Sequence, residues 1–354
     1  MDMKRSYYKD LRLFDTLPLG LWLCACCLVL AAVPFHVGNY TLYLLGYIAI
    51  NVIVAVGLNV LVGYTGQISL GHAGFFAIGA YAAVLLVNAG LPIPLALPAA
   101  ALIAAAFGLL LGLPALRLEG PYLAVITLGF GLTVENIFAK TPAFGGATGP
   151  AVPAFTLTLV PGWSREQNLY LLIMLLAGAS LLAVRNLMRT RVGRAFVAIR
   201  DSDVAAACAG VDLTWYKTLA FAVSAFFTGL AGGLFAFHLG QVDPTTFNLM
   251  LSILFLAMVV IGGVGSILGP VLGAVAISLL NLKLKGLQLA DFEQIPLFGP
   301  SIAGFLGRNF METGMANIQF IVYGAILVSI MIFEPLGLYG LWVRSKRYWR
   351  AWPL

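Results

Sequence analysis

Residues 57–81 have the sequence GLNVLVGYTGQISLGHAGFFAIGAY, and this stretch decides the class of fold. It holds six glycines in an otherwise apolar run, with Asn59, Gln67, Ser69 and His72 spaced through it. Small residues let membrane helices approach one another closely, and polar groups at membrane depth need partners in protein or water. The stretch therefore predicts packed membrane helices whose polar side chains either line a pathway or hydrogen-bond to one another.

The rest of the chain has the same apolar character. Of its 354 residues, 61% are hydrophobic and 10% are charged, whereas soluble domains carry roughly 25% charged residues. A soluble globule this apolar has too few polar side chains to cover its surface. The composition excludes a soluble enzyme and favours a single integral membrane domain over residues 1–354.

The fold class predicted from this pattern is all-α, a polytopic transmembrane bundle of about ten crossings. A spanning helix needs about 20 largely apolar residues. Runs of this kind lie near residues 18–36, 40–62, 67–88, 94–116, 121–139, 168–187, 218–238, 249–268, 269–282 and 317–336. The segments 67–88 and 249–282 are rich in Gly and Pro, which favours re-entrant or broken helices there.

Basic residues set the predicted orientation. They cluster before the first run, in the central segment 185–217 and after the last run, with Arg117 in a further short loop. Because positive residues stay on the inner side of a membrane, we expect both termini and the loop 188–217 to be cytoplasmic. The loops 140–167 and 283–316 then lie outside. A contiguous basic face with aromatics is missing, so nucleic-acid binding is not expected.

The sequence offers no site for a metal or for ATP. Cys24, Cys26 and Cys27 lie in an apolar run without CxxC spacing, so no metal site is expected. No GxxxxGK[ST] motif occurs, so the chain has no P-loop of its own. Acids at membrane depth are scarce, Glu135 being the main candidate, whereas ion-driven pumps usually need them. Energy for transport would come from another polypeptide, and an ion-coupled transporter working alone is the alternative.

Ser69 and His72 raise one further alternative, a serine hydrolase within the membrane. Their spacing of three residues would place them on one face of a helix. However, residues 57–81 contain no carboxylate that could orient His72, and the chain has no GxSxG elbow. Packing or pathway polarity is the favoured interpretation.

The segment 193–221, GRAFVAIRDSDVAAACAGVDLTWYKTLAF, starts with basic residues and continues into an Ala-rich helix that Gly210 can end. A rigid, exposed element joined to a membrane helix is what a conformational signal from a cytoplasmic partner requires. Composition alone favours an ordinary basic loop. Further along, GGVGSILGPVLGA at 262–274 predicts a tight turn or a broken helix between two crossings.

Taken together, these stretches resemble the permease subunits of bacterial ABC importers for branched-chain amino acids, and most closely the longer of the two permeases in those systems. The likeness is carried by residues 57–81, by residues 193–236 and by EPLGLYGLW at 334–342. It spans roughly residues 40–342.

The resemblance implies a bacterial inner-membrane subunit that holds no cofactor itself. Its implied partners are membrane lipid, a second related permease, two cytoplasmic ATPase subunits that bind ATP-Mg, and a periplasmic protein that delivers leucine, isoleucine, valine or a similar amino acid. The ATPase-coupling role that the resemblance implies falls on Arg194, Arg200, Asp201, Asp203, Gly210 and Tyr216. Family members often have an acid where this chain has Ala207, which puts a salt bridge from that position in doubt. Permeases for urea and short amides are also similar and give the second interpretation.

Overall fold

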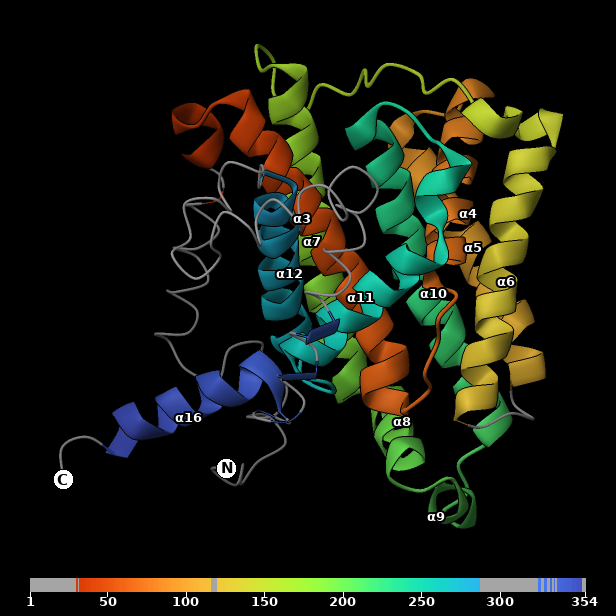
Figure 1. The fold of residues 1–354 in the computed structure, drawn as a ribbon, viewed down its shortest axis with the longest axis vertical. Coiled ribbons are helices and arrows are strands. Elements are labelled where there is room, and N and C mark those ends of the chain that lie inside the picture. The colour runs from red at the N-terminus through yellow and green to blue at the C-terminus, as the bar shows by residue number, and fades with distance from the viewer. Residues whose placement is uncertain are drawn as a thin grey trace, which may run out of the picture.

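A computed structural model describes residues 32–115, 120–286 and 336–351, together with Leu30 and isolated positions between 324 and 334. Every regular element in these ranges is helical, which confirms the predicted all-helical class (Figure 1). The predicted crossings at 18–36 and 317–336, the loop at 283–316 and Arg117 lie wholly or largely outside the described residues.

Among the described residues, five helices are long and apolar enough to cross a membrane. They are α3 (Asn39–Asn59) with its π-helical continuation η1 (Val60–Tyr64), α5 (Ile93–Ala115), α6 (Pro121–Lys140), α7 (Arg165–Arg189) and α10 (Leu213–Leu239). Three apolar helices are shorter: α4 (His72–Asn88), α11 (Leu249–Gly262) and α12 (Gly269–Gly286). These helices coincide with the apolar runs between residues 40 and 282, and the total of ten crossings stays a prediction.

Two of the predicted runs are interrupted, both in Gly-rich sequence. Residues 66–71 are not helical, so α4 begins at His72 and not at residue 67. Likewise α11 ends at Gly262, and residues 263–268 form turns before α12. Gly66 and Gly263 have φ angles of +72° and +121°, a conformation that glycine adopts readily and that ends a helix. We call these two interruptions the first break (66–71) and the second break (263–268).

The centre of the bundle is α10, which packs against α5, α4 and α3. Glycines make the packing close enough for backbone to meet backbone. A Cβ on Gly79 would overlap the backbone of Gly229, and a Cβ on Gly232 would overlap the carbonyl of Phe76. Small residues play this role where membrane helices pack tightly.

The helices α6 and α7 present apolar faces outward. Of the residues in their apolar stretches, 28% in α6 and 22% in α7 are buried, against 83% in α3 and in α10. Tyr122 on α6 is 73% exposed and Leu175 on α7 is 59% exposed. Apolar faces of this extent need to be covered, which suits contact with lipid or with another membrane protein.

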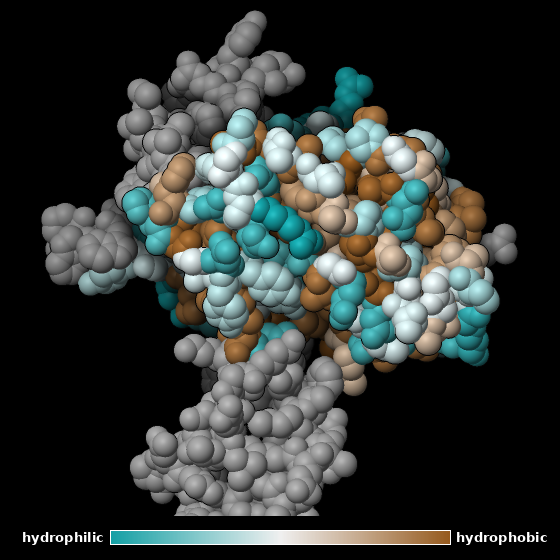
Figure 2. Space-filling view, turned by 90° about the horizontal axis from the view of Figure 1, so that it is seen from above, coloured by the Kyte–Doolittle hydropathy of each residue, from teal (hydrophilic) through white to brown (hydrophobic). Residues whose placement is uncertain are grey.

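The bundle has two distinct ends. The short helices α8 (Arg191–Asp201) and α9 (Asp203–Cys208) lie together at one end, which we call the coupling end (Figure 1). The helix α16 (Gly337–Ala351) starts near the same end, where a Cβ on Gly337 would lie 2.6 Å from the carbonyl oxygen of Ile261. The opposite end includes the short helices η2 (Pro142–Phe144), η3 (Gly146–Thr148) and η4 (Pro244–Phe247). Polar side chains cover much of this opposite end, with apolar ones between them and along the margin (Figure 2).

Candidate functional site

Four buried polar side chains lie at or beside the first break: Asn59, Gln67, Ser69 and His72. Ser69 and His72, both 0% exposed, are in contact, with 3.0 Å between Ser69 Oγ and His72 Nδ1. The other ring nitrogen of His72 lies 2.7 Å from Oγ of Ser224 on α10. His72 therefore connects the first break to the central helix of the bundle.

Two further hydroxyl groups bind backbone amides at this break. The amide of Leu70 donates to Thr127 Oγ1 on α6 at 2.9 Å, and the amide of Ala73 donates to Ser252 Oγ on α11 at 2.9 Å. Ala73 lies in the first turn of α4, where amides have no partner within the helix itself, so Ser252 supplies the acceptor that this turn lacks. Leu70 lies in the break, and Thr127 binds its amide there. Sequence reasoning missed Thr127, Ser224 and Ser252. The signal available for each of them was a hydroxyl residue inside a largely apolar run.

Asn59 connects α3 to the second break. Its Nδ2 donates to the carbonyl of Ser266 at 2.8 Å, and its Oδ1 accepts from the amide of Gly265 at 3.0 Å. Gln67 differs, because both of its side-chain amide atoms are buried without a hydrogen-bond partner among the described residues. Three of the four predicted pathway residues thus have protein partners, and their role as pathway lining stays a prediction.

The geometry around His72 bears on the hydrolase alternative. A serine hydrolase needs a carboxylate on the imidazole nitrogen opposite the nucleophile. In this chain that nitrogen meets the hydroxyl of Ser224, and neither Ser69 nor His72 has any exposed surface. The arrangement is a buried hydrogen-bonded link between helices, which favours the packing interpretation.

At the coupling end, Arg200 in the last turn of α8 contacts both breaks, and a Cβ on Gly66 of the first break would lie 3.5 Å from its Cγ. Its Nη1 donates to the carbonyl oxygen of Gly63, in the π-helical end of the first span, at 2.7 Å. The same guanidinium lies against Gly265 of the second break, where a Cβ would overlap it. Carbonyls at the end of a helix carry partial negative charge, so the cation suits this position.

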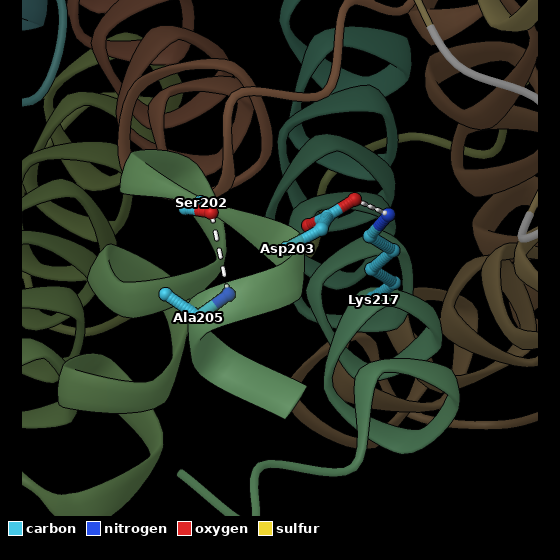
Figure 3. A network of polar contacts seen from close by, with 4 residues as sticks. All are labelled: Ser202, Asp203, Ala205 and Lys217. Carbon is cyan, nitrogen blue, oxygen red and sulfur yellow. Dashed lines mark hydrogen bonds and ion pairs between the residues drawn. The ribbon is translucent and has the colours of Figure 1, made fainter. Parts of the chain in front are cut away.

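The helix α9 is attached to α10 by an ion pair. Asp203, in the first turn of α9, pairs with Lys217 of α10, and their side chains are 29% and 13% exposed (Figure 3). Ser202 caps the same helix by accepting from the amide of Ala205 at 3.3 Å. An acid near a helix N-terminus is also favourable for the helix dipole. Asp203 thus has a structural partner within the chain, and Lys217 is a residue that sequence reasoning did not single out.

The turn after α9 is formed by Gly210. With φ at +82°, its amide donates to Ala207 at 3.0 Å and the next amide, of Val211, donates to Ala206 at 3.0 Å. These are the two hydrogen bonds of a Schellman motif, which favours glycine. The sequence predicted that Gly210 could end the helix, and the structure places it in this role.

The other predicted coupling residues differ in whether they pack against a neighbouring helix. Tyr216 on α10 packs edge-on against Phe196 of α8, with 6.3 Å between ring centroids. Arg194 and Asp201 are exposed on α8, and Arg194 bonds only locally, to the carbonyl of Arg189 at 3.4 Å among the contacts that the structure describes. Arg200, Asp203 and Tyr216 therefore hold the segment of α8 and α9, which we call the coupling segment, on the membrane helices. Arg194, Arg200 and Asp201 are all exposed, and of these three Arg200 makes the contact with the membrane helices.

Comparison with known proteins matches the chain to one family model and to several transport permeases. A family model described as branched-chain amino acid transport system / permease component matches residues 40–331. High-affinity branched-chain amino acid transport system permease protein LivM from Salmonella typhimurium and its counterpart from Escherichia coli are each 35% identical over 349 residues, covering 92% of this chain and 76% of the relative. Ribose import permease protein RbsC from Haemophilus influenzae is 30% identical over 112 residues, covering 30% of this chain and 34% of the relative. No solved structure matches the chain.

The family model covers most of the chain, including both breaks, the coupling segment and the central helix α10. The chain belongs to the family of branched-chain amino acid transport system permease components.

Proposed function

We propose that this chain is the membrane-spanning permease subunit of an ATP-driven importer for branched-chain amino acids. Family membership supports the substrate class. The observation that carries the mechanism is the position of Arg200, which joins the exposed coupling segment to both helix breaks. The chain provides the passage, and ATP hydrolysis takes place on separate ATPase subunits that bind ATP-Mg.

The coupling segment moves as one unit in this mechanism. Asp203 and Lys217 tie α9 to α10, and Tyr216 rests against α8. Closure of the ATPase pair displaces α8, and Arg200 passes the displacement to the first and second breaks. Segments that end helices can absorb changes in backbone angles, as hinges do. Access then alternates between the two ends of the bundle.

Orientation and assembly follow from the same proposal. The coupling end faces the cytoplasm of a bacterial cell, and the opposite end receives the amino acid from a periplasmic binding protein. The exposed apolar faces of α6 and α7 are available to a second, related permease and to lipid.

The test is reconstitution of the assembled importer in vesicles. The chain, its second permease and the two ATPases are purified together, and the binding protein is added outside. We expect uptake of leucine, isoleucine and valine that requires ATP. Uptake of urea or short amides in preference to these amino acids would overturn the substrate class. Uptake by this chain alone, driven by an ion gradient without ATP, would overturn the mechanism.

A further inference from the structure

A cavity of about 410 Å³ opens in the half of the bundle that lies away from α8. Its walls come from α3, α10, α11, α12 and η4, together with Phe76 of α4. Small-molecule sites in proteins span roughly 300–1,000 Å³, so this one can hold a single small solute. The four polar residues at the first break are not among its lining residues.

Aromatic rings form one part of the cavity wall. Phe76 lies with its ring centroid 5.1 Å from that of Phe235 and 5.3 Å from that of Phe255. Phe76 is 2% exposed and Phe255 is 0% exposed, so neighbouring residues hold both rings in place. Leu44 and Leu254 complete this apolar surface. A fixed apolar surface of this kind suits a branched aliphatic side chain, because contact with it removes apolar area from water.

The polar groups in the wall are uncharged. Among the lining residues that the structure describes, none is Asp, Glu, Lys or Arg. Asn51 donates to Ser278 at 2.9 Å. Asn248 caps α11, where its Oδ1 accepts a hydrogen bond from the amide of Leu251. Asn281 is different, because its Oδ1 is buried with no hydrogen-bond partner among the described residues.

An unpartnered buried acceptor calls for a donor. An amide oxygen accepts a hydrogen bond from an ammonium group, while amide nitrogens and hydroxyls donate to a carboxylate. A net-neutral zwitterion therefore matches the described part of the wall, which carries amides and no net charge. A solute with a charged side chain would find no counter-charge among the described lining residues, and burying such a charge unpaired is costly.

We propose that this cavity is a transient binding site for one branched-chain amino acid, with its aliphatic side chain against Phe76 and Phe235 and its amino group at Asn281. The proposal rests on the proposed function and adds where the substrate is held within the chain. It separates substrate binding from the polar link at His72, which holds the helices together.

The test uses thiol labelling in the assembled importer. The native cysteines Cys24, Cys26, Cys27 and Cys208 are replaced by alanine, and Leu254→Cys is introduced in the wall of the cavity. In the absence of ATP, we expect saturating leucine, supplied with the binding protein, to slow the labelling of Leu254→Cys by a water-soluble maleimide several-fold. Lysine and urea are expected to leave the rate unchanged. Met250→Cys, at a lining position that is 41% exposed, provides a second reporter.

Val204→Cys on α9 serves as the control, because this residue is 75% exposed at the other end of the bundle. Leucine should not alter its labelling. Adding Asn281→Leu to Leu254→Cys should abolish the protection by leucine. Equal labelling rates at both cavity reporters with and without leucine, in an importer that transports leucine, would overturn the site and leave the proposed function standing. Protection by leucine in an assembly that shows no ATP-dependent uptake would instead overturn the proposed function.

Discussion

The guanidinium of Arg200 donates a hydrogen bond to the carbonyl oxygen of Gly63, with 2.7 Å between Nη1 and O. Arg200 lies in the last turn of the exposed helix α8, and Gly63 lies in the π-helical segment η1 that continues the buried helix α3. Because Gly63 lies three residues before Gly66, this bond holds the exposed helix α8 on the helix that leads into the first break. π-Helical turns inside longer helices are frequent at functional sites.

Replacing Arg200 with alanine should uncouple transport from ATP hydrolysis. Hydrogen bonds to charged groups contribute about 1.5–3 kcal/mol, so we expect leucine uptake to fall about tenfold or more. Hydrolysis by the assembled complex should continue. Uptake and phosphate release are measured on the same vesicles. Lys140→Ala, which removes a cation at the other end of the bundle, should leave both rates unchanged. Normal uptake by Arg200→Ala would contradict a role for this contact.

Replacing Gly210 with valine should impair coupling through backbone geometry alone. A Cβ at this position meets no atom within 4 Å, so the effect comes from the positive φ, which costs about 1–2 kcal/mol for an L-residue. We expect lower uptake per ATP hydrolysed, with the thermal stability of the membrane bundle unchanged. Gly210→Asn is the matched control, since asparagine tolerates this conformation. Equal coupling in the valine and asparagine variants would show that the turn is not required.

Replacing Gly79 with alanine should destabilise the bundle itself. The new methyl group would overlap the backbone of Gly229 where α4 meets α10, and overpacking of this kind costs about 1–3 kcal/mol. We expect a lower unfolding temperature in detergent. Gly178→Ala on α7 is the control, because a Cβ there meets nothing within 4 Å and alanine favours helix by about 1 kcal/mol. Equal unfolding temperatures for the two variants would contradict the close packing of α4 on α10.

The helical class and most helix positions could be predicted from sequence because they depend on local patterns. Apolar runs of sufficient length, such as 121–139, correspond closely to observed helices. Both breaks could be predicted because they lie in glycine-rich sequence, and glycine is the residue that adopts a positive φ most readily. That Gly210 ends α9 could also be predicted from local sequence, because an Ala-rich helical stretch directly precedes this glycine.

Contacts between distant segments could not be predicted in the same way. Nothing near Ser69 indicates that the second partner of His72 is Ser224, far along the chain on α10. The ion pair of Asp203 with Lys217 depends on how α9 folds back on α10. The cavity at Phe76 depends on several helices at once. One sequence contains the residues for such contacts but does not identify their pairing.

The serines around His72 allow the packing and hydrolase interpretations to be separated. If the contacts are structural, Ser224→Ala and Ser69→Ala should each lower the unfolding temperature, because each leaves one nitrogen of a fully buried ring unpaired. The expected cost is about 1–3 kcal/mol in each case. Leucine uptake per folded assembly should be retained in both variants. A hydrolase would instead lose all activity in Ser69→Ala and keep much of it in Ser224→Ala.

Ser180→Ala provides the reference for these two variants. Ser180 is also buried, but its hydroxyl donates to the carbonyl of Leu176 within its own helix α7 at 2.7 Å. Its loss removes no contact between helices, so its unfolding temperature should stay close to that of the unmodified chain. If Ser69→Ala abolished function at unchanged unfolding temperature while Ser224→Ala and Ser180→Ala had no effect, the buried link would not be structural, and Ser69 would have to act on a substrate.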